Sequence, residues 1–294
     1  MIDKALLDTT EYAILTDSGC DLPEEFLGKL GVTCVELRVI GERGNERILP
    51  PDPAELAATY RSLVEGGARA VLSIHSSSQL SDAVEWAGIA AEQSGVPVEV
   101  IDSGCVSVAL GIVVDCVATA KANGATLGEA VSVASKVAEE TRILFIPSKG
   151  ALPEDLHGLG RQGGLLAGMA SLRRRIAGEQ RLLSIRRGEL PVELFANVDP
   201  SDLTGRAVRT VSRASQEIGP VYYALVDARA GRLLHLLEKP LDTNEFEHSR
   251  LGVVPAGTAT LASAGEGAIA LAYVPQAVYD AASGKTDPTK TQEG

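Results

Sequence analysis

Three short segments combine hydroxyl and carboxyl side chains where a predicted strand passes into a predicted helix. They read TDSGCDLP at residues 16–23, HSSS at residues 75–78 and IDSGCVS at residues 101–107. Hydroxyl groups, and the free backbone N–H groups at a helix start, donate hydrogen bonds to an acidic group, and the helix dipole favours its negative charge. The residue types therefore favour recognition of a polar or acidic part of a ligand.

Each segment also has a simpler interpretation. Ser and Asp are preferred N-cap residues, so one hydroxyl in each segment could do no more than cap its helix. The second segment, however, holds three consecutive serines, Ser76, Ser77 and Ser78, and a cap uses only one. In parallel α/β sheets, ligands bind where strands end and helices begin. We therefore expect the segments to share one ligand site.

The presence of His75 suggests catalysis as an alternative function of the same strand ends. Together with Asp102 and a nearby serine, it could act in a serine- and histidine-dependent hydrolase or transferase. The sequence contains no G-x-S-x-G nucleophile elbow, and it has neither a P-loop nor a G-x-G-x-x-G loop after the first predicted strand. His75 also follows the apolar run of its own strand, which favours a structural role.

The four cysteines, Cys20, Cys34, Cys105 and Cys116, include no C-x-x-C pair. The sequence therefore predicts free thiols and no zinc site. Cys20 and Cys105 follow strands at helix starts, where a thiol can be activated, but a buried structural role is the simpler interpretation.

Composition narrows the classes of partner. The chain has 294 residues and a formal net charge of −12, which disfavours nucleic acids and anionic membrane surfaces. No apolar run approaches the roughly 18 residues of a transmembrane helix, and the first residues do not resemble a signal peptide. We expect a cytoplasmic protein. Only 4% of the residues are aromatic while 45% are hydrophobic, so the core is mainly aliphatic.

The first half of the chain alternates between apolar strands and helical patterns. This alternation predicts a doubly wound parallel α/β domain over residues 1–150. The strands are expected at 12–18, 32–40, 70–75, 97–102 and 142–147, and the helices at 22–30, 53–67, 78–95, 106–124 and 126–141.

The second half is less regular and predicts a smaller α+β domain over residues 151–280. We expect a hairpin at 180–197 with Arg187 and Gly188 at its turn, helices at 200–219 and 228–241, and strands at 221–228 and 268–275. Residues 281–294 are polar and predict a disordered tail.

Arginines are concentrated beyond the middle of the chain, at Arg173, Arg174 and Arg175, with Arg181, Arg186 and Arg187 further on. They could form a solvated helix face. They could instead form a positive patch at the seam between the domains that meets an acidic ligand or partner. A third hypothesis is a regulatory protein–protein module that uses the arginine run as its interface.

Taken in order, the motifs resemble the DegV family, over nearly the whole chain. The resemblance rests on five segments: TDSGCDLP at 16–23, SIHSSSQLS at 73–81, IDS at 101–103 with Leu110-Gly111, LGRQGG at 159–164, and GEGAIAL at 265–271.

This resemblance implies a two-domain carrier, not an enzyme, that holds one fatty acid in an aliphatic tunnel between the domains. Relatives present the acyl chain to a fatty acid kinase, so a kinase is an expected partner and no cofactor is expected. The implied carboxylate contacts are Ser77, Ser78, Ser103 and Ser263, with Asp17, Ser18 and His75 organising the site. Arg161 and Arg173–Arg175 are the expected contacts to a partner.

The chain departs from the family pattern at three places. A T-S-Q-P-S segment is replaced around residues 47–52 by RILPPD, and a Gly-Gly-Arg becomes Gly163-Gly164-Leu165. A Thr-His pair becomes Ala262-Ser263, which removes a histidine expected at the head group. The resemblance therefore implies a divergent member.

Overall fold

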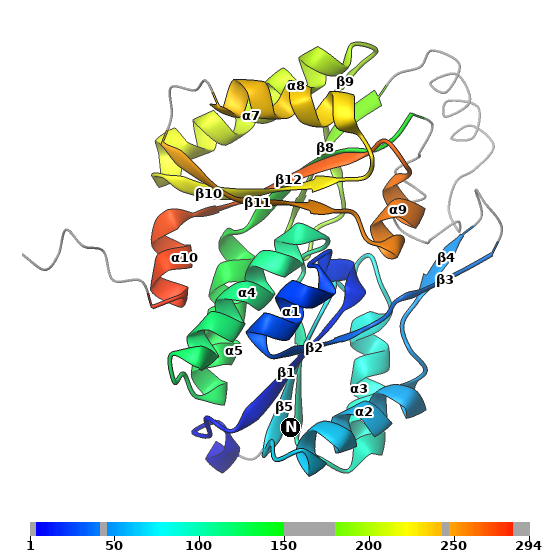
Figure 1. Cartoon of the computed structure of the whole chain (residues 1–294), viewed down its shortest axis with the longest axis vertical. Coiled ribbons are helices and arrows are strands. Elements are labelled where there is room, and N and C mark those ends of the chain that lie inside the picture. The colour runs from blue at the N-terminus through cyan, green and yellow to red at the C-terminus, as the bar shows by residue number, and fades with distance from the viewer. Residues whose placement is uncertain (1–3, 42–45, 150–179, 243–246, 285–294) are drawn as a thin grey trace, which may run out of the picture.

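The computed structural model describes residues 4–41, 46–149, 180–242 and 247–284. Within these residues the strands form a four-stranded sheet in the order β2-β1-β5-β6 and a six-stranded sheet in the order β11-β10-β12-β7-β8-β9, with a small β3-β4 ribbon. Figure 1 shows the four-stranded sheet in the lower half of the view and the six-stranded sheet in the upper half.

The four-stranded sheet is parallel throughout and covered by helices on both faces. Its strands are β1 (Tyr12–Asp17), β2 (Val32–Val35), β5 (Ala70–His75) and β6 (Val98–Asp102). Alternate side chains point to opposite faces. Leu15 and Val71 pack on one side against α2 (Pro53–Glu65) and α3 (Ala83–Ser94). Ile14 and Leu72 pack on the other side against α1 (Glu24–Leu30), α4 (Val108–Ala122) and α5 (Leu127–Glu140). The predicted parallel α/β architecture is confirmed.

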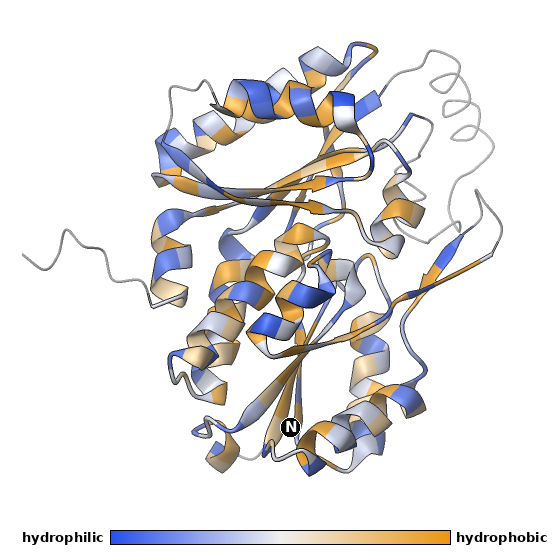
Figure 2. Cartoon of the chain, in the orientation of Figure 1, coloured by the Kyte–Doolittle hydropathy of each residue, from blue (hydrophilic) through white to orange (hydrophobic). Residues whose placement is uncertain are grey.

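The six-stranded sheet is mixed. β10 and β11 run parallel, and the other neighbouring strands are antiparallel. Two helices, α7 (Pro200–Ile218) and α8 (Gly231–Asp242), bury their apolar sides against one face. Figure 2 shows hydrophobic colours along the strands and both colours on these helices. The strands are β7 (Arg142–Ile146), β8 (Gln180–Arg186), β9 (Val192–Asn197), β10 (Val221–Asp227), β11 (His248–Pro255) and β12 (Ile269–Pro275).

Helix α4 joins the two sheets into one core. Residues on every side of it are buried, including Leu110, Val113 and Val117. They share a hydrophobic cluster with Ile14 of the parallel sheet and Ala272 of the six-stranded sheet. A helix that is apolar all round belongs in an interior, which is where α4 lies.

Several sequence predictions need correction. The strand predicted at 142–147 is β7, and it joins the six-stranded sheet between β12 and β8 instead of the parallel sheet. The strand predicted at 32–40 divides into β2 and β3 (Arg38–Ile40), and β3 pairs with β4 (Arg47–Leu49). The predicted helix at 78–95 begins only at Ala83. Strand β11 and the helices α9 (Thr258–Ala264) and α10 (Gln276–Ala282) were not predicted.

The hairpin predicted at 180–197 is confirmed. The hairpin consists of β8 and β9, and Gly188 in its turn has a φ of 67°, which glycine adopts without strain. Most of the tail predicted at 281–294 lies outside the described residues.

Candidate functional site

The three polar segments meet at one edge of the parallel sheet. Asp17 ends β1, His75 ends β5 and Asp102 ends β6. The register pairs Thr16 with Ile74 and His75 with Asp102, so the three strand ends lie side by side. Because all the strands run in the same direction, their carboxyl ends open toward the same space.

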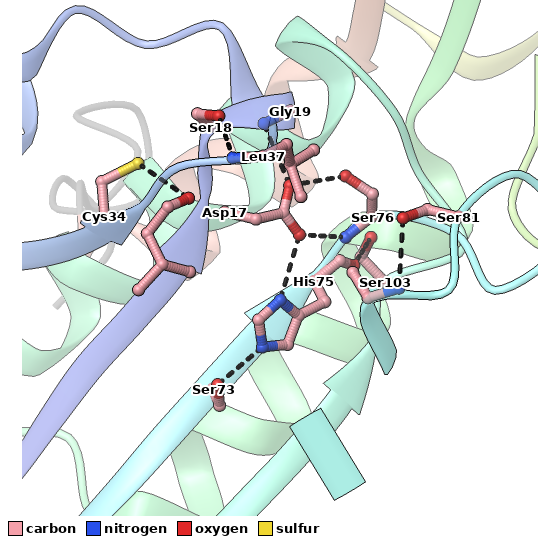
Figure 3. Close-up of polar contacts among 12 residues, drawn as sticks. Asp17, Ser18, Gly19, Cys34, Leu37, Ser73, His75, Ser76, Ser81 and Ser103 are labelled. Atoms are coloured by element: carbon pink, nitrogen blue, oxygen red, sulfur yellow. Dashed lines mark hydrogen bonds and ion pairs between the residues drawn. The ribbon is translucent and has the colours of Figure 1, made fainter. Parts of the chain in front are cut away.

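Asp17 is the centre of this edge and is fully buried. Its Oδ1 accepts hydrogen bonds from the Gly19 N–H at 3.0 Å and the Ser76 hydroxyl at 2.7 Å. Its Oδ2 accepts from the Ser76 N–H at 2.9 Å and meets His75 Nδ1 at 3.0 Å. Figure 3 shows these contacts converging on the carboxylate. Asp17 therefore fixes η2 (Ser18–Cys20) and the start of the serine segment relative to each other.

The protonation of this centre follows from its contacts. Burial alone would raise the pKa of Asp17, but the hydrogen bond and charge of His75, with the two bonds from Ser76, outweigh it and lower the pKa. An ionised carboxylate only accepts hydrogen bonds, so the proton between the two side chains resides on His75 Nδ1.

A chain of hydrogen bonds continues from His75 into the sheet. His75 Nε2 lies 2.7 Å from Ser73 Oγ, which lies 2.9 Å from the Tyr60 hydroxyl. The order Asp17–His75–Ser73 is that of a Ser-His-Asp triad. All three side chains are at most 1% exposed, and none of them lines the pocket described below. This triad geometry lies in the interior, where a substrate has no access to Ser73.

Ser77 and Ser78 lie on the loop that follows His75, and their hydroxyls are engaged locally. Ser78 is exposed, and its hydroxyl donates to the Asp102 carboxylate, whose other oxygen accepts the Ser78 N–H at 3.3 Å. Ser77 is buried, and its Oγ accepts the N–H of Gln79 at 3.3 Å. Neither residue lines the pocket.

Two other predicted head-group serines donate to backbone carbonyls. The buried Ser103 donates to His75 O at 2.7 Å and holds the ends of β5 and β6 together. Ser263 does line the pocket, and its hydroxyl donates to the carbonyl one turn earlier in α9 at 2.9 Å. Ser18 Oγ accepts the Leu37 N–H at 2.9 Å and ties η2 to the chain before β3.

Asp21 links the two sheets. It is buried, has a φ of 55° and projects from the segment after η2 toward α9. Its Oδ1 accepts the Gly257 N–H at 2.7 Å, and its Oδ2 accepts the hydroxyls of Thr260, at 2.7 Å, and Ser107. Burial is the largest influence on this carboxyl, and it raises the pKa despite these hydrogen bonds.

A pocket lies between this edge and the inner face of the six-stranded sheet. Counted with the open space at its mouth, its volume is about 840 Å³. Its apolar wall includes Ile143, Phe145, Ile185, Val226 and Ala270 from the sheet. Leu37 and Ile48 line it from the chain around the β3-β4 ribbon.

Several hydroxyl side chains line the pocket. Ser263 was predicted as a head-group contact, whereas four others, Ser76, Ser81, Ser107 and Thr260, were not. Ser76, Ser81 and Ser107 belong to the quoted motifs, so spacing alone could have included them. Thr260 lies on α9, a helix of small residues without a clear periodic signal, and no sequence feature distinguished it.

The thiols offer no reactive group at this edge. Hydrogen bonding to Cys34, together with burial, raises the pKa of Cys20 well above its usual value. Burial raises the pKa of Cys105 to about 12. Both thiols are therefore protonated near neutral pH.

The described residues contain no cluster of three metal-ligating side chains. Nor does any helix among them have the length and apolarity to cross a membrane. Arg161 and Arg173–Arg175, the residues predicted to contact a partner, lie outside the described residues.

Comparison with known proteins supplies the family. Residues 42–276 match the family model described as "Uncharacterised protein, DegV family". A DegV domain-containing protein of Streptomyces coelicolor is 35% identical over 154 residues, covering 45% of this chain and 55% of that relative. One from Deinococcus radiodurans is 34% identical over 155 residues, with the same coverage. The chain thus matches about half the length of these curated relatives.

Solved structures show the same fold over more of the chain. A DegV family protein from Corynebacterium glutamicum has a TM-score of 0.75 at 21% identity, covering 91% of this chain and 97% of its own. A DegV family protein from Thermus thermophilus, described for its fatty acid binding, has a TM-score of 0.76 at 20% identity, covering 90% and 99%. With a family model that spans most of its length, this chain belongs to the DegV family.

Proposed function

We propose that this protein binds one long-chain fatty acid in the pocket between its two sheets and acts as a carrier. The observation that carries the proposal is the pocket itself, which combines an apolar wall from the six-stranded sheet with hydroxyl groups from the strand-end segments and α9. An acyl chain with one polar head has the same division. DegV proteins from Thermus thermophilus and Bacillus subtilis are described as fatty acid binding, which supports this ligand class.

The energetics are adequate for such a ligand. Each buried CH₂ contributes about 0.8 kcal/mol, so a dozen contribute roughly 10 kcal/mol before the entropic cost of association. The head group then needs only a few hydrogen bonds to fix its position.

We place the head group near Ser81 and Ser76, which line the pocket. Of the serines implied by the family resemblance, Ser77, Ser78 and Ser103 stay predictions, because their hydroxyls have the partners described above. A kinase that receives the ligand also stays a prediction.

Native mass spectrometry of the protein as purified from cells tests the function. We expect a bound species with a mass in the fatty acid range that is released on denaturation. A protein that carries no such species, and that also fails to bind added oleate, would exclude the proposal.

Ser81→Ala tests the place of the head group. The variant loses one hydrogen bond to the ligand, and we expect oleate affinity to fall by about 1 kcal/mol, or roughly fivefold. Ser81 Oγ also accepts the Ala83 N–H at 3.1 Å near the start of α3. The matched control is Thr126→Ala, which removes a hydroxyl that accepts an N–H at the start of α5 and does not line the pocket. Equal oleate affinities in the two variants would contradict this placement.

The hydrolase alternative has one observation in its favour, the Asp17–His75–Ser73 arrangement. Because Ser73 is fully buried and bonded to Tyr60, we infer a structural role for it. A fluorophosphonate probe that reacts with activated serines should leave the native protein unlabelled. Labelling of Ser73, mapped by peptide mass spectrometry, would favour the enzyme.

A further inference from the structure

The hydroxyls that line the pocket mostly direct their protons away from it. Ser76 donates to Asp17 at 2.7 Å, Thr260 donates to Asp21 at 2.7 Å, and Ser107 donates to Asp21 as well. A hydroxyl whose proton is used in this way retains lone pairs that can accept a hydrogen bond. These groups therefore present hydrogen-bond acceptors to a ligand.

The backbone donors near the hydroxyls are used in the same manner. The Gly19 N–H donates to Asp17 at 3.0 Å, and the Gly257 N–H donates to Asp21 at 2.7 Å. Ser263 donates its proton to the Ala259 carbonyl. Two buried carboxylates thus consume donors that a bound anion would need.

Ser81 differs from the other pocket hydroxyls. Its Oγ accepts the Ala83 N–H at 3.1 Å, and among the described residues its own proton has no acceptor. Ser81 can therefore donate one hydrogen bond to a ligand in the pocket. Among the described side chains that line the pocket, Ser81 is thus the hydroxyl with a proton left to donate, and the others offer acceptors.

We propose that the pocket binds the head group in a neutral, hydrogen-bearing form, as a protonated carboxylic acid or a primary alcohol. This inference rests on the proposed function and specifies the ligand's chemical state. The O–H of the head group donates to Ser76 or Thr260, and its second oxygen or lone pair accepts from Ser81. A carboxylate has only acceptors, so it could take a hydrogen bond from Ser81 but could donate none to Ser76 or Thr260.

A pH dependence of binding could arise from titratable groups of the protein as well as from the ligand. None of the described residues that line the pocket is titratable. Asp17 and Asp21 stand directly behind the lining hydroxyls, and His75 stands behind Asp17. On neighbouring strands, Asp102 accepts from Ser78 and Gly104, Asp227 accepts from Ala230, and Arg142 donates to backbone carbonyls. A matched pair of ligands distinguishes the two sources of titration.

The experiment compares dodecanoic acid with 1-dodecanol on the full chain between pH 6 and pH 8. If only the neutral acid binds well, its affinity falls by up to about tenfold per pH unit above its free pKa, which for carboxyls is about 4. The alcohol's affinity should stay constant. A parallel loss for both ligands would assign the titration to the protein and would overturn the inference.

A direct measurement uses dodecanoic acid labelled with ¹³C at the carboxyl carbon. We expect the bound carboxyl to stay protonated in NMR spectra up to at least about pH 7, roughly three units above the pKa of the free acid, as for a carboxyl buried without a countercharge. Ser76→Ala removes an acceptor, and we expect both ligands to bind roughly fivefold more weakly.

Failure of this inference can be distinguished from failure of the proposed function. Acid that binds ionised at pH 7, with an alcohol that does not bind, would overturn this inference and leave the proposed function standing. If neither ligand binds at any pH, both proposals fail.

Discussion

The two faces of the six-stranded sheet carry side chains of different size on its strand β12. Toward α7 and α8 the strand presents Leu271 and Tyr273, both of which are buried in one cluster. Toward the parallel sheet it presents Ala270 and Ala272. Because strand residues alternate between faces, one segment of sequence builds a filled interior on one side and a roomier one on the other.

The difference explains where the pocket lies. Large side chains interdigitate with helices to close packing density, and the outer face does this. On the inner face Ala270 is joined in the pocket lining by Ala228, Ala259, Ala264 and Ala268, which leave space between the sheet and the hydroxyl-rich edge opposite. Ligand binding should thus depend on the inner face, and stability should depend on the outer face and on the buried network of the edge.

The largest expected effect concerns that buried network. Asp17→Asn removes the charged partner of His75 in a fully buried pair, which typically costs about 3–5 kcal/mol in the free energy of unfolding. The folded state lowers the pKa of Asp17, so its contribution is complete above the unfolded value of about 4 and is lost as the pH falls through the folded value. Urea unfolding at pH 7 and pH 3 should show the gap between wild type and variant narrowing in acid.

A matched control for this prediction is Asp199→Asn. Hydrogen bonds from Ser201 also lower the pKa of Asp199, but this carboxyl is fully exposed. We expect a much smaller loss of stability. A gap between wild type and Asp17→Asn that stays constant from pH 7 to pH 3 would refute the role assigned to the ionised carboxylate.

Leu271→Ala tests the outer face. The side chain is 1% exposed, and its truncation should lower the free energy of unfolding by about 2–5 kcal/mol. Oleate affinity of the folded protein should not change, because the side chain faces away from the pocket. The control is Leu190→Ala, where the side chain is 49% exposed and the expected loss is below about 0.5 kcal/mol. If Leu271→Ala instead weakened oleate binding and left stability intact, the roles assigned to the two faces would be reversed.

Ala270→Leu tests the inner face and has the smallest expected effect. The added carbons should occupy space that the acyl chain needs and weaken oleate binding by about 2 kcal/mol, or roughly 30-fold. Stability should change little, because the pocket accommodates the new side chain. Ala58→Leu makes the same change at an exposed position of α2. If both variants bind oleate as the wild type does, the acyl chain does not lie against β12.

Local pattern predicted much of this molecule. Continuous apolar runs located β1, β5, β6 and β12, and the same strand-to-helix junctions predicted that Asp17, His75 and Asp102 would lie at one edge. Pattern did not predict the partner of β7, because a buried apolar strand has the same sequence in either sheet. It also missed α9, whose residues TATLASA are small and lack a marked apolar period.

The directions of the hydroxyl groups in the site could not be predicted from the sequence. The sequence indicated an excess of serine hydroxyls, but each hydroxyl's direction depends on an acceptor supplied from elsewhere in the chain. Ser78 donates to Asp102, Ser76 donates to Asp17, and Ser107 donates to Asp21. These partners lie 24, 59 and 86 residues away along the chain.

The sequence by itself determined the alternation of strands and helices, the aliphatic character of the interior, and the gathering of polar groups at the strand ends. These properties follow from local periodicity and residue type. Only the tertiary structure decided which sheet β7 joins, that Asp21 holds α9 against the parallel sheet, and which hydroxyls face the pocket with lone pairs instead of protons. Those properties depend on contacts between residues distant in the chain, and a local pattern does not encode its distant partner.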